Sequence, residues 1–142
     1  MERPLLRFHL AIAVRDLAST RAFYGGVLGC PEARGHDDSC TFDWFGHQLV
    51  CHVAPEQAAG HARVDSTGDG VVPARHFGAL FDWDEWPRRV AALRAKGMQF
   101  LVEPAEHDHG AGGLQATCFF ADPSGNVIEW KTLKEPERLF AR

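Results

Sequence analysis

The 142-residue sequence predicts an α+β fold, with two βαβββ modules in one domain. An internal repeat is the first observation: segments beginning at Phe8 and His76 each open with an apolar stretch, continue with an amphipathic segment and end at a glycine. Strand-like runs separated by turn residues follow each segment, which is the second observation. The order strand, helix and further strands thus occurs twice along the chain, and this order predicts mixed or mainly antiparallel sheets.

The first module is expected over residues 6–55. Its opening strand is "FHLAIAV", and an amphipathic helix follows. Asp16 is a suitable N-cap for this helix and Gly29 a suitable C-cap. The runs "CTFDWFG" and "HQLVCHVAP" then predict two strands.

The second module is expected over residues 74–133, after a connection at 56–73 that is rich in alanine, glycine and aspartate. Its opening strand is "HFGALF", and its helix is expected between Asp84 as N-cap and Gly97 as C-cap. Residues 134–142 form a C-terminal tail.

Three further strands are expected in the second module, from "MQFLVEP", "LQATCFFADPSG" and "NVIEWKTL". The stretch "PAEHDHGAGG" from Pro104 has the composition of a flexible loop. The run from Asp122 to Asn126 predicts a tight turn that sets the register of the last strand, and with it the face that carries Glu129.

Composition excludes several classes of function. The net charge is −4 and the isoelectric point is near 6.0, so the chain has no basic surface for nucleic acid or an anionic membrane. No apolar run approaches the ~20 residues that span a bilayer, and the N-terminus has no signal-peptide pattern. The four cysteines form no CxxC pair and are expected to be reduced thiols. We therefore expect a cytoplasmic protein that acts on small molecules.

Metal-competent side chains recur at related places in the two modules. His9 and His76 both lie at the head of an opening strand, and the closing strands carry His52 and Glu129. If a pseudo-two-fold axis relates the modules, these four side chains point into one cavity. Two histidines and one carboxylate form the facial triad of non-haem ferrous sites, and the same ligand types also suit catalytic zinc.

The sequence resembles the vicinal oxygen chelate superfamily, which includes glyoxalase I, extradiol dioxygenases, fosfomycin-modifying enzymes and bleomycin-resistance proteins. The resemblance rests on "FHLAIAVRDLASTRAFYGGVLG", "HFGALFDWDEW" and "DPSGNVIEW". It implies paired βαβββ modules forming a curled mixed sheet around a metal cleft. It also implies that His9, His76 and Glu129 are the metal ligands, and that His52 occupies the place of a fourth ligand in glyoxalase-like members.

Within this superfamily, the His, His, Glu set resembles that of extradiol dioxygenases. The resemblance implies a divalent metal, Fe(II) in the first place with Mn, Zn or Ni as alternatives, and an aromatic or vicinal-diol substrate. His52 is then expected to be an acid–base group or a fourth ligand. Two alternatives stay open: a glyoxalase-like isomerase or lyase, and a non-catalytic, resistance-type binding protein. By analogy with the superfamily, a homodimer is expected.

Overall fold

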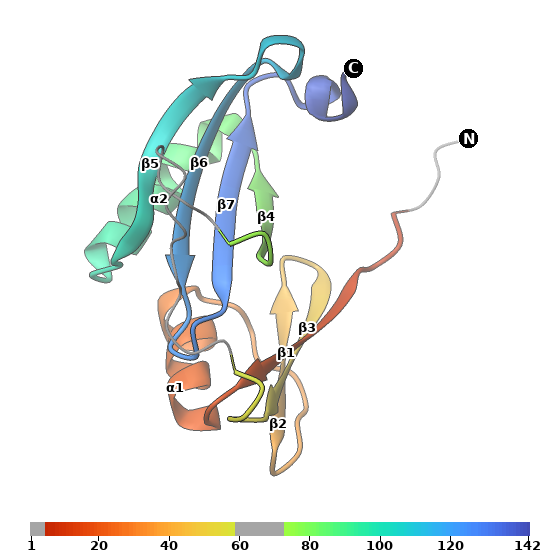
Figure 1. Ribbon diagram of the computed structural model, residues 1–142, viewed down its shortest axis with the longest axis vertical. Helices are drawn as coiled ribbons and strands as arrows, with labels where there is room; N and C mark the ends of the chain where they lie inside the picture. The colour runs from red at the N-terminus through yellow and green to blue at the C-terminus, as the bar shows by residue number, and fades with distance from the viewer. Residues whose placement is uncertain (1–4, 59–72) are drawn as a thin grey trace. The chain divides into compact units, whose positions relative to one another are not determined.

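The computed structural model describes residues 5–58 and 73–142, and it confirms an α+β fold with βαβββ-type modules (Figure 1). The described chain forms two compact units. Unit 1 comprises Met1–His61 with Pro123–Asn126, and unit 2 comprises Ala62–Asp122 with Val127–Arg142. Each unit has its own mixed sheet, of three strands in unit 1 and four strands in unit 2. Most of the predicted connection at 56–73 lies outside the described residues.

Unit 1 contains a strand, a helix and two strands. These are β1 (His9–Val14), α1 (Leu17–Arg21) continued by the π-helical turn η1 (Ala22–Val27), β2 (Ser39–Trp44) and β3 (His47–Val53). The strand order is β1-β3-β2, with β1 parallel and β2 antiparallel to the central β3. Where a further strand would follow the helix, two isolated bridges join Glu32 to Phe42 and His36 to Ser39.

The predicted caps of the first helix are confirmed. Asp16 Oδ1 accepts a hydrogen bond from the backbone N–H of Ser19 at 2.7 Å, and this bond is the main reason why the pKa of Asp16 is lowered. Gly29 ends the helical segment with φ at 72°, a conformation that costs glycine little. The helix is thereby fixed against one face of the sheet, where Tyr24 contacts Phe42 and Trp44.

Unit 2 repeats the plan with one more strand. Its elements are β4 (Phe77–Phe81), the 3₁₀ turn η2 (Trp83–Glu85), α2 (Trp86–Ala95), β5 (Phe100–Asp108), the 3₁₀ turn η3 (Gly110–Gly112), β6 (Leu114–Ala121), β7 (Val127–Leu133) and the 3₁₀ turn η4 (Pro136–Phe140). The order is β4-β7-β6-β5, with β4 parallel to β7 and the other pairs antiparallel. In both units the opening strand therefore pairs in parallel with the closing strand.

Helix α2 covers one face of the four-stranded sheet (Figure 1). The guanidinium groups of Arg89 and Arg94 lie 4.0 and 5.2 Å from the ring centres of Phe81 and Phe100. Beneath the helix, Trp130 packs against the rings of Phe81 and Phe120. Residues that alternate with these along the strands point to the opposite, open face.

Two expectations for unit 2 were wrong. Asp84 does not cap the helix, because it lies inside the 3₁₀ turn that precedes α2. The stretch from Pro104 is not a loop throughout, since β5 runs to Asp108 and His107 pairs with Gln115 on β6. The strand tolerates Pro104 because β5 is an edge strand and its register shifts between Val102 and Ala105.

The turn at residues 122–126 connects β6 to β7, as predicted, and its residues Pro123–Asn126 belong to unit 1. The hydroxyl of Ser124 accepts a hydrogen bond from the backbone N–H of Arg15 at 2.9 Å, and the side-chain amide of Asn126 donates to the carbonyl of Ala13 at 2.9 Å. The guanidinium of Arg15 also donates to the carbonyl of Pro123. The turn is thus tied to the end of β1.

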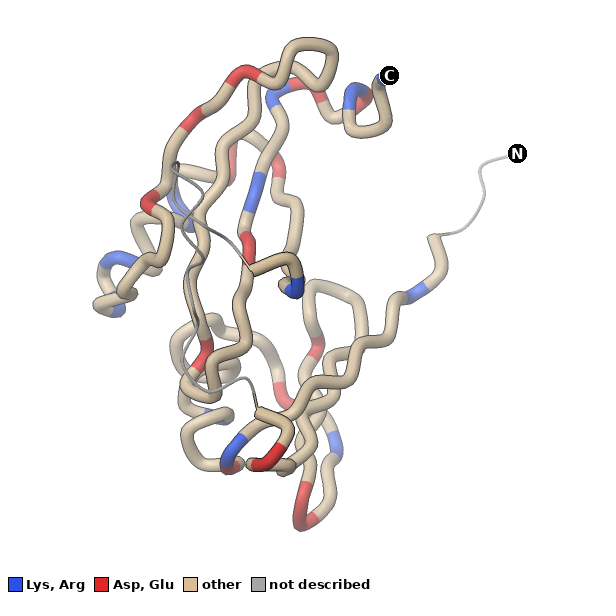
Figure 2. The backbone as a smooth tube through the Cα atoms, viewed as in Figure 1, with Lys and Arg blue, Asp and Glu red and all other residues tan. Residues whose placement is uncertain are grey.

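The backbone positions of basic and acidic residues are interspersed along the chain in both units (Figure 2), in keeping with the small net charge. In the part of the chain that the structure describes, no helix has both the length and the apolar character needed to cross a bilayer.

All four cysteines are buried and free of disulfides. Cys118 lies on β6 facing the core of unit 2, and burial raises the pKa of its thiol from 9.0 to about 12. Above pH 9 the unfolded chain releases this proton while the folded chain retains it. The corresponding contribution to stability is therefore complete below pH 9 and is lost as the pH rises toward 12.

We expect the free energy of unfolding of the wild type to fall more steeply above pH 9 than that of Cys118→Ala. The difference in slope should be roughly 1 kcal/mol per pH unit between about pH 9 and 12. Urea denaturation at pH 8, 9, 10 and 11 measures it. Parallel curves for the two proteins would contradict the assignment to Cys118.

Candidate metal centre

Glu129 lies in the middle of β7 on the open face of the unit 2 sheet. Its cross-strand neighbours are Gly78 on β4 and Phe119 on β6. The Glu129 side chain is 18% exposed, so it is partly desolvated but reachable from solvent. Lys131, two residues further along β7, shares this face, and its Nζ lies 3.8 Å from Glu129 Oε1.

Gly78 allows β4 to approach Glu129 closely. A Cβ atom at position 78 would overlap the carbonyl oxygen of Glu129. Because this obstacle is backbone and not a movable side chain, any larger residue must displace one of the two strands. The glycine therefore fixes the position from which the Glu129 side chain projects.

His76 immediately precedes β4 and brings its ring to Glu129. Its Nε2 lies 3.3 Å from Glu129 Oε2, and its Nδ1 lies 2.8 Å from the carbonyl oxygen of Pro73. The His76 ring also packs edge-on against Phe119, with ring centres 5.4 Å apart. Two of the three predicted ligands are thus neighbours in one unit.

The hydrogen bond to Pro73 determines what His76 presents to Glu129. A carbonyl oxygen can only accept, so Nδ1 carries the proton. In a neutral ring, Nε2 then carries a lone pair that faces the lone pairs of the Glu129 carboxylate, and this contact is repulsive. A cation between the two groups, either a proton or a metal ion, removes the repulsion. An Nδ1–H bond to a backbone carbonyl is also the usual outer support of a metal-bound histidine.

The separation of the two atoms suits adjacent ligands of one ion. With metal–ligand bonds of about 2.1 Å, neighbouring donor atoms are about 3.0 Å apart in octahedral and about 3.4 Å apart in tetrahedral coordination. The observed 3.3 Å between His76 Nε2 and Glu129 Oε2 falls in this interval. Nitrogen and carboxylate donors together suit first-row divalent metals. The residues in unit 2 therefore fit a divalent transition metal.

His9 in unit 1 has an equivalent arrangement. It begins β1, pairs with Gln48 on β3, and its Nδ1 lies 2.7 Å from Gln48 Oε1. The amide oxygen accepts, so Nδ1 again carries the proton and Nε2 is available as a donor to a metal. His9 is exposed on the face of the sheet opposite Tyr24 and the helix.

His52 shares that open face but lies far along it from His9. It pairs with Ala13 on β1 and Ser39 on β2, four residues beyond Gln48, the partner of His9. Four residues of strand correspond to about 13 Å. In unit 2, Gly78 lies two residues after His76 and pairs with Glu129. In unit 1, Ala11 lies two residues after His9 and pairs with Val50, so Val50 occupies the position that corresponds to Glu129. The register therefore disfavours His52 as a fourth ligand beside His9.

Within each unit, the described residues contain no group of three or more His, Cys, Asp or Glu side chains close enough to hold a metal. The pair His76–Glu129 is the part of the predicted ligand set that one unit brings together. Sequence reasoning missed Gly78, and it gave no role in the site to Gln48 or Lys131. Strand alternation placed Lys131 on the face of Glu129, and this was the available signal.

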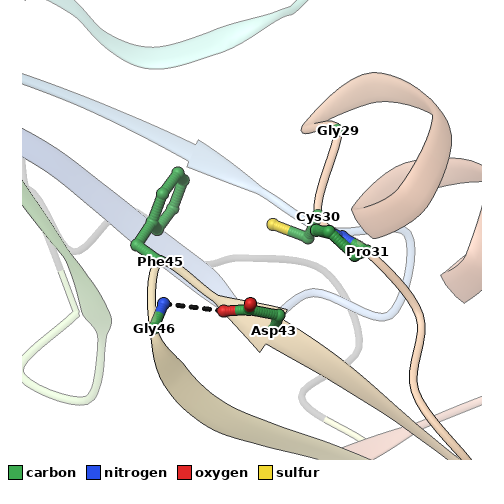
Figure 3. A pocket seen from close by; sticks show the side chains of 6 residues that line it. All are labelled: Gly29, Cys30, Pro31, Asp43, Phe45 and Gly46. Carbon is green, nitrogen blue, oxygen red and sulfur yellow. Dashed lines mark hydrogen bonds between the residues drawn. The ribbon is translucent and has the colours of Figure 1, made fainter.

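A separate pocket of about 170 Å³ lies in unit 1, beside the turn between β2 and β3. It is lined by Gly29, Cys30, Pro31, Asp43, Phe45 and Gly46 (Figure 3). Asp43 Oδ1 accepts a hydrogen bond from the backbone N–H of Gly46 at 2.6 Å, which holds the turn. None of the predicted ligands lines this pocket.

Comparison with known proteins gives the same superfamily as the sequence motifs. The profile of the "Glyoxalase/Bleomycin resistance protein/Dioxygenase superfamily" matches residues 7–130. A search of curated proteins found no match.

Solved structures resemble the chain over nearly its whole length. A glyoxalase/bleomycin resistance protein/dioxygenase from Alicyclobacillus acidocaldarius is 33% identical with a TM-score of 0.78, and 99% of each chain is covered. The fosfomycin resistance protein FosX from Listeria monocytogenes is 16% identical with a TM-score of 0.70, covering 99% of this chain and 100% of that one. Lactoylglutathione lyase from Agrobacterium tumefaciens is 21% identical with a TM-score of 0.65, covering 94% and 97%. The last two are similar in fold alone. The profile match and the 33% identity show that the chain belongs to the glyoxalase/bleomycin resistance protein/dioxygenase superfamily.

Proposed function

We propose that the protein is a divalent-metal enzyme in which His9, His76 and Glu129 hold the ion. The observation that carries the proposal is the contact of His76 Nε2 with Glu129 Oε2, combined with the Nδ1 bond to Pro73. The matching Nδ1 bond of His9 to Gln48 supports the third ligand. Fe(II) is the expected metal, with Mn, Zn or Ni as alternatives.

The reaction that this ligand set favours is an extradiol-type oxidation of a catechol-type substrate. The bound metal would supply a Lewis acid and a template for two vicinal oxygens. Phe119, buried edge-on against His76, makes the surroundings of this ligand apolar, which suits an aromatic substrate. His52 is the candidate acid–base group, since histidine is the side chain that most often transfers protons in enzymes and His52 is exposed on the open face of the unit 1 sheet.

A glyoxalase-like isomerisation or lyase reaction is the second candidate, and one observation favours it. Tyr24, the one tyrosine of the chain, is fully buried against Phe42 and Trp44 under the sheet of unit 1. Its hydroxyl therefore does not reach the open face, so the chain offers no tyrosine there as an acid–base group for ring cleavage. An enediolate intermediate would not need oxygen or that group.

Location and assembly complete the proposal. Four buried cysteines that form no disulfides suit a reducing compartment, so we propose a cytoplasmic protein. A homodimer is proposed by analogy with the superfamily.

The test is anaerobic reconstitution with Fe(II) followed by metal analysis. About one equivalent per chain is expected, together with oxygen uptake on a panel of catechols. Metal without oxygen uptake, but with turnover of the methylglyoxal–glutathione hemithioacetal, would replace the dioxygenase with the second candidate. Less than about a tenth of an equivalent of Fe, Mn, Zn or Ni would overturn the enzyme and favour a binding protein.

A further inference from the structure

Lys131 is a charged residue on the open face of the unit 2 sheet. It has no role in the function proposed above. Its neighbours along β7, Trp130 and Thr132, point to the face that α2 covers. Its cross-strand partners are Thr117 on β6 and Leu80 on β4. Its side chain is 28% exposed, so it is held near the sheet and not fully extended into solvent. Among the described residues of its unit, its ionic partner is Glu129, at the long distance of 3.8 Å.

Metal binding at Glu129 would leave the ammonium group of Lys131 without its full counter-charge. When Glu129 donates to a divalent cation, its charge is shared with the metal and no longer neutralises the ammonium group. The ammonium and the metal then repel each other across a partly desolvated surface, where the effective dielectric constant is lower than in water. The chelating oxygens of a catechol bring negative charge to the metal, whereas a further anionic group on the substrate, placed beside Lys131, neutralises the ammonium group directly.

The neighbours of Lys131 can complete an anion site. The Thr117 side chain shares its face directly across the strand pair and is not exposed, and its hydroxyl can donate a hydrogen bond. Gln115, two residues away on β6, directs its amide nitrogen to the carbonyl of Gly112 at 3.3 Å, so its amide serves the adjoining turn. On the other side, Leu80 is 51% exposed and offers apolar contact to the body of a ligand.

We infer that the substrate carries an anionic oxygen group, a carboxylate or a phosphonate, which Lys131 and Thr117 bind beside the metal. The inference rests on the proposed function, because it assigns the substrate class of the same site. Positions 129 and 131 are about 7 Å apart along the strand, so the anionic group and the chelating oxygens lie at opposite ends of a compact molecule. Lys131 acts here as a specificity-determining residue.

The test uses three probes that differ in one group: catechol, 3,4-dihydroxybenzoate and 3,4-dihydroxyphenylphosphonate. Their dissociation constants are measured on cobalt-loaded protein by calorimetry. In the wild type, at least one anionic probe should bind about tenfold more tightly than catechol, as expected for one charge-assisted hydrogen bond. The tighter of the two identifies carboxylate or phosphonate as the group.

The variants are Lys131→Met, Lys131→Arg and the matched control Lys134→Met, which removes an exposed lysine just beyond β7. Lys131→Met should retain cobalt and lose the preference for the anionic probe, while Lys131→Arg and Lys134→Met should keep it. Equal binding of all three probes to wild type, or a preference that survives in Lys131→Met, would overturn the inference.

Failure of the proposed function has a different signature. If the wild type takes up no cobalt, the metal proposal fails and the probes are titrated into metal-free protein. If the metal-free wild type still prefers an anionic probe and Lys131→Met does not, the inference of an anion site stands without the metal. If the metal-free wild type shows no preference, both the metal proposal and the anion site are overturned.

Discussion

Replacing Glu129 with glutamine is expected to lower the affinity for Fe(II) or Co(II) at least about 100-fold. Glu129 supplies the negative charge among the three proposed ligands, and a neutral amide oxygen is a weaker donor. Loss of an outer partner of a metal ligand already costs 10- to 100-fold, so loss of the ligand itself should cost no less. Titration of anaerobic protein with Co(II), followed by visible absorption, measures the affinity.

The matched control is Glu103→Gln on β5. Glu103 has a side chain that is 68% exposed and pairs with Arg94 at the surface, so its loss should leave metal affinity unchanged. Thermal melting of both variants would show that each is folded. Wild-type cobalt affinity in folded Glu129→Gln would remove Glu129 from the ligand set.

Replacing Gly78 with alanine is expected to destabilise the protein by about 3 kcal/mol, at the upper end for an overpacked site. The added Cβ would overlap the Glu129 carbonyl oxygen, so β4 and β7 must separate at the point where His76 and Glu129 meet. Metal affinity should fall together with stability. Urea denaturation measures the first effect and cobalt titration the second.

Gly26→Ala is the control for this substitution. Gly26 lies in the helical segment of unit 1, and a Cβ there would meet no atom within 4 Å. Its replacement should change stability by no more than about 1 kcal/mol, in the stabilising direction that helix propensity favours. If Gly78→Ala proves as stable as Gly26→Ala, the two strands are not held as closely as described.

Local signals predicted much of the fold. The cap at Asp16, the helix ends at Gly29 and Gly97, and the turn before β7 depend on a few neighbouring residues, and the structure confirms them. The prediction at Asp84 was wrong because a 3₁₀ turn separates β4 from α2, which a capping pattern does not reveal. Strand β5 was predicted too short because Pro104 breaks a central strand but not an edge strand with an irregular register.

For the candidate site, the sequence predicts which face of a sheet each residue occupies but not how far apart the residues lie. Strand alternation tells which face a residue occupies, so it placed Glu129 and Lys131 together and His52 on the face of His9. It does not tell how far along the sheet a residue lies, because a shift of two residues keeps every side chain on its face. The distance of His52 from His9 therefore emerged only from the pairing of β1 with β3.

The central claim is that the Nε2 atoms of His76 and His9 bind one metal ion while their Nδ1 atoms keep their protons. Long-range ¹H–¹⁵N NMR of the histidine rings, recorded during titration with Zn(II), tests it most directly. We predict that both rings are Nδ1-protonated and that one equivalent of Zn(II) shifts the Nε2 resonances of His76 and His9 together. Stoichiometric zinc that leaves these Nε2 resonances in place, or that binds either ring through Nδ1, would contradict the claim.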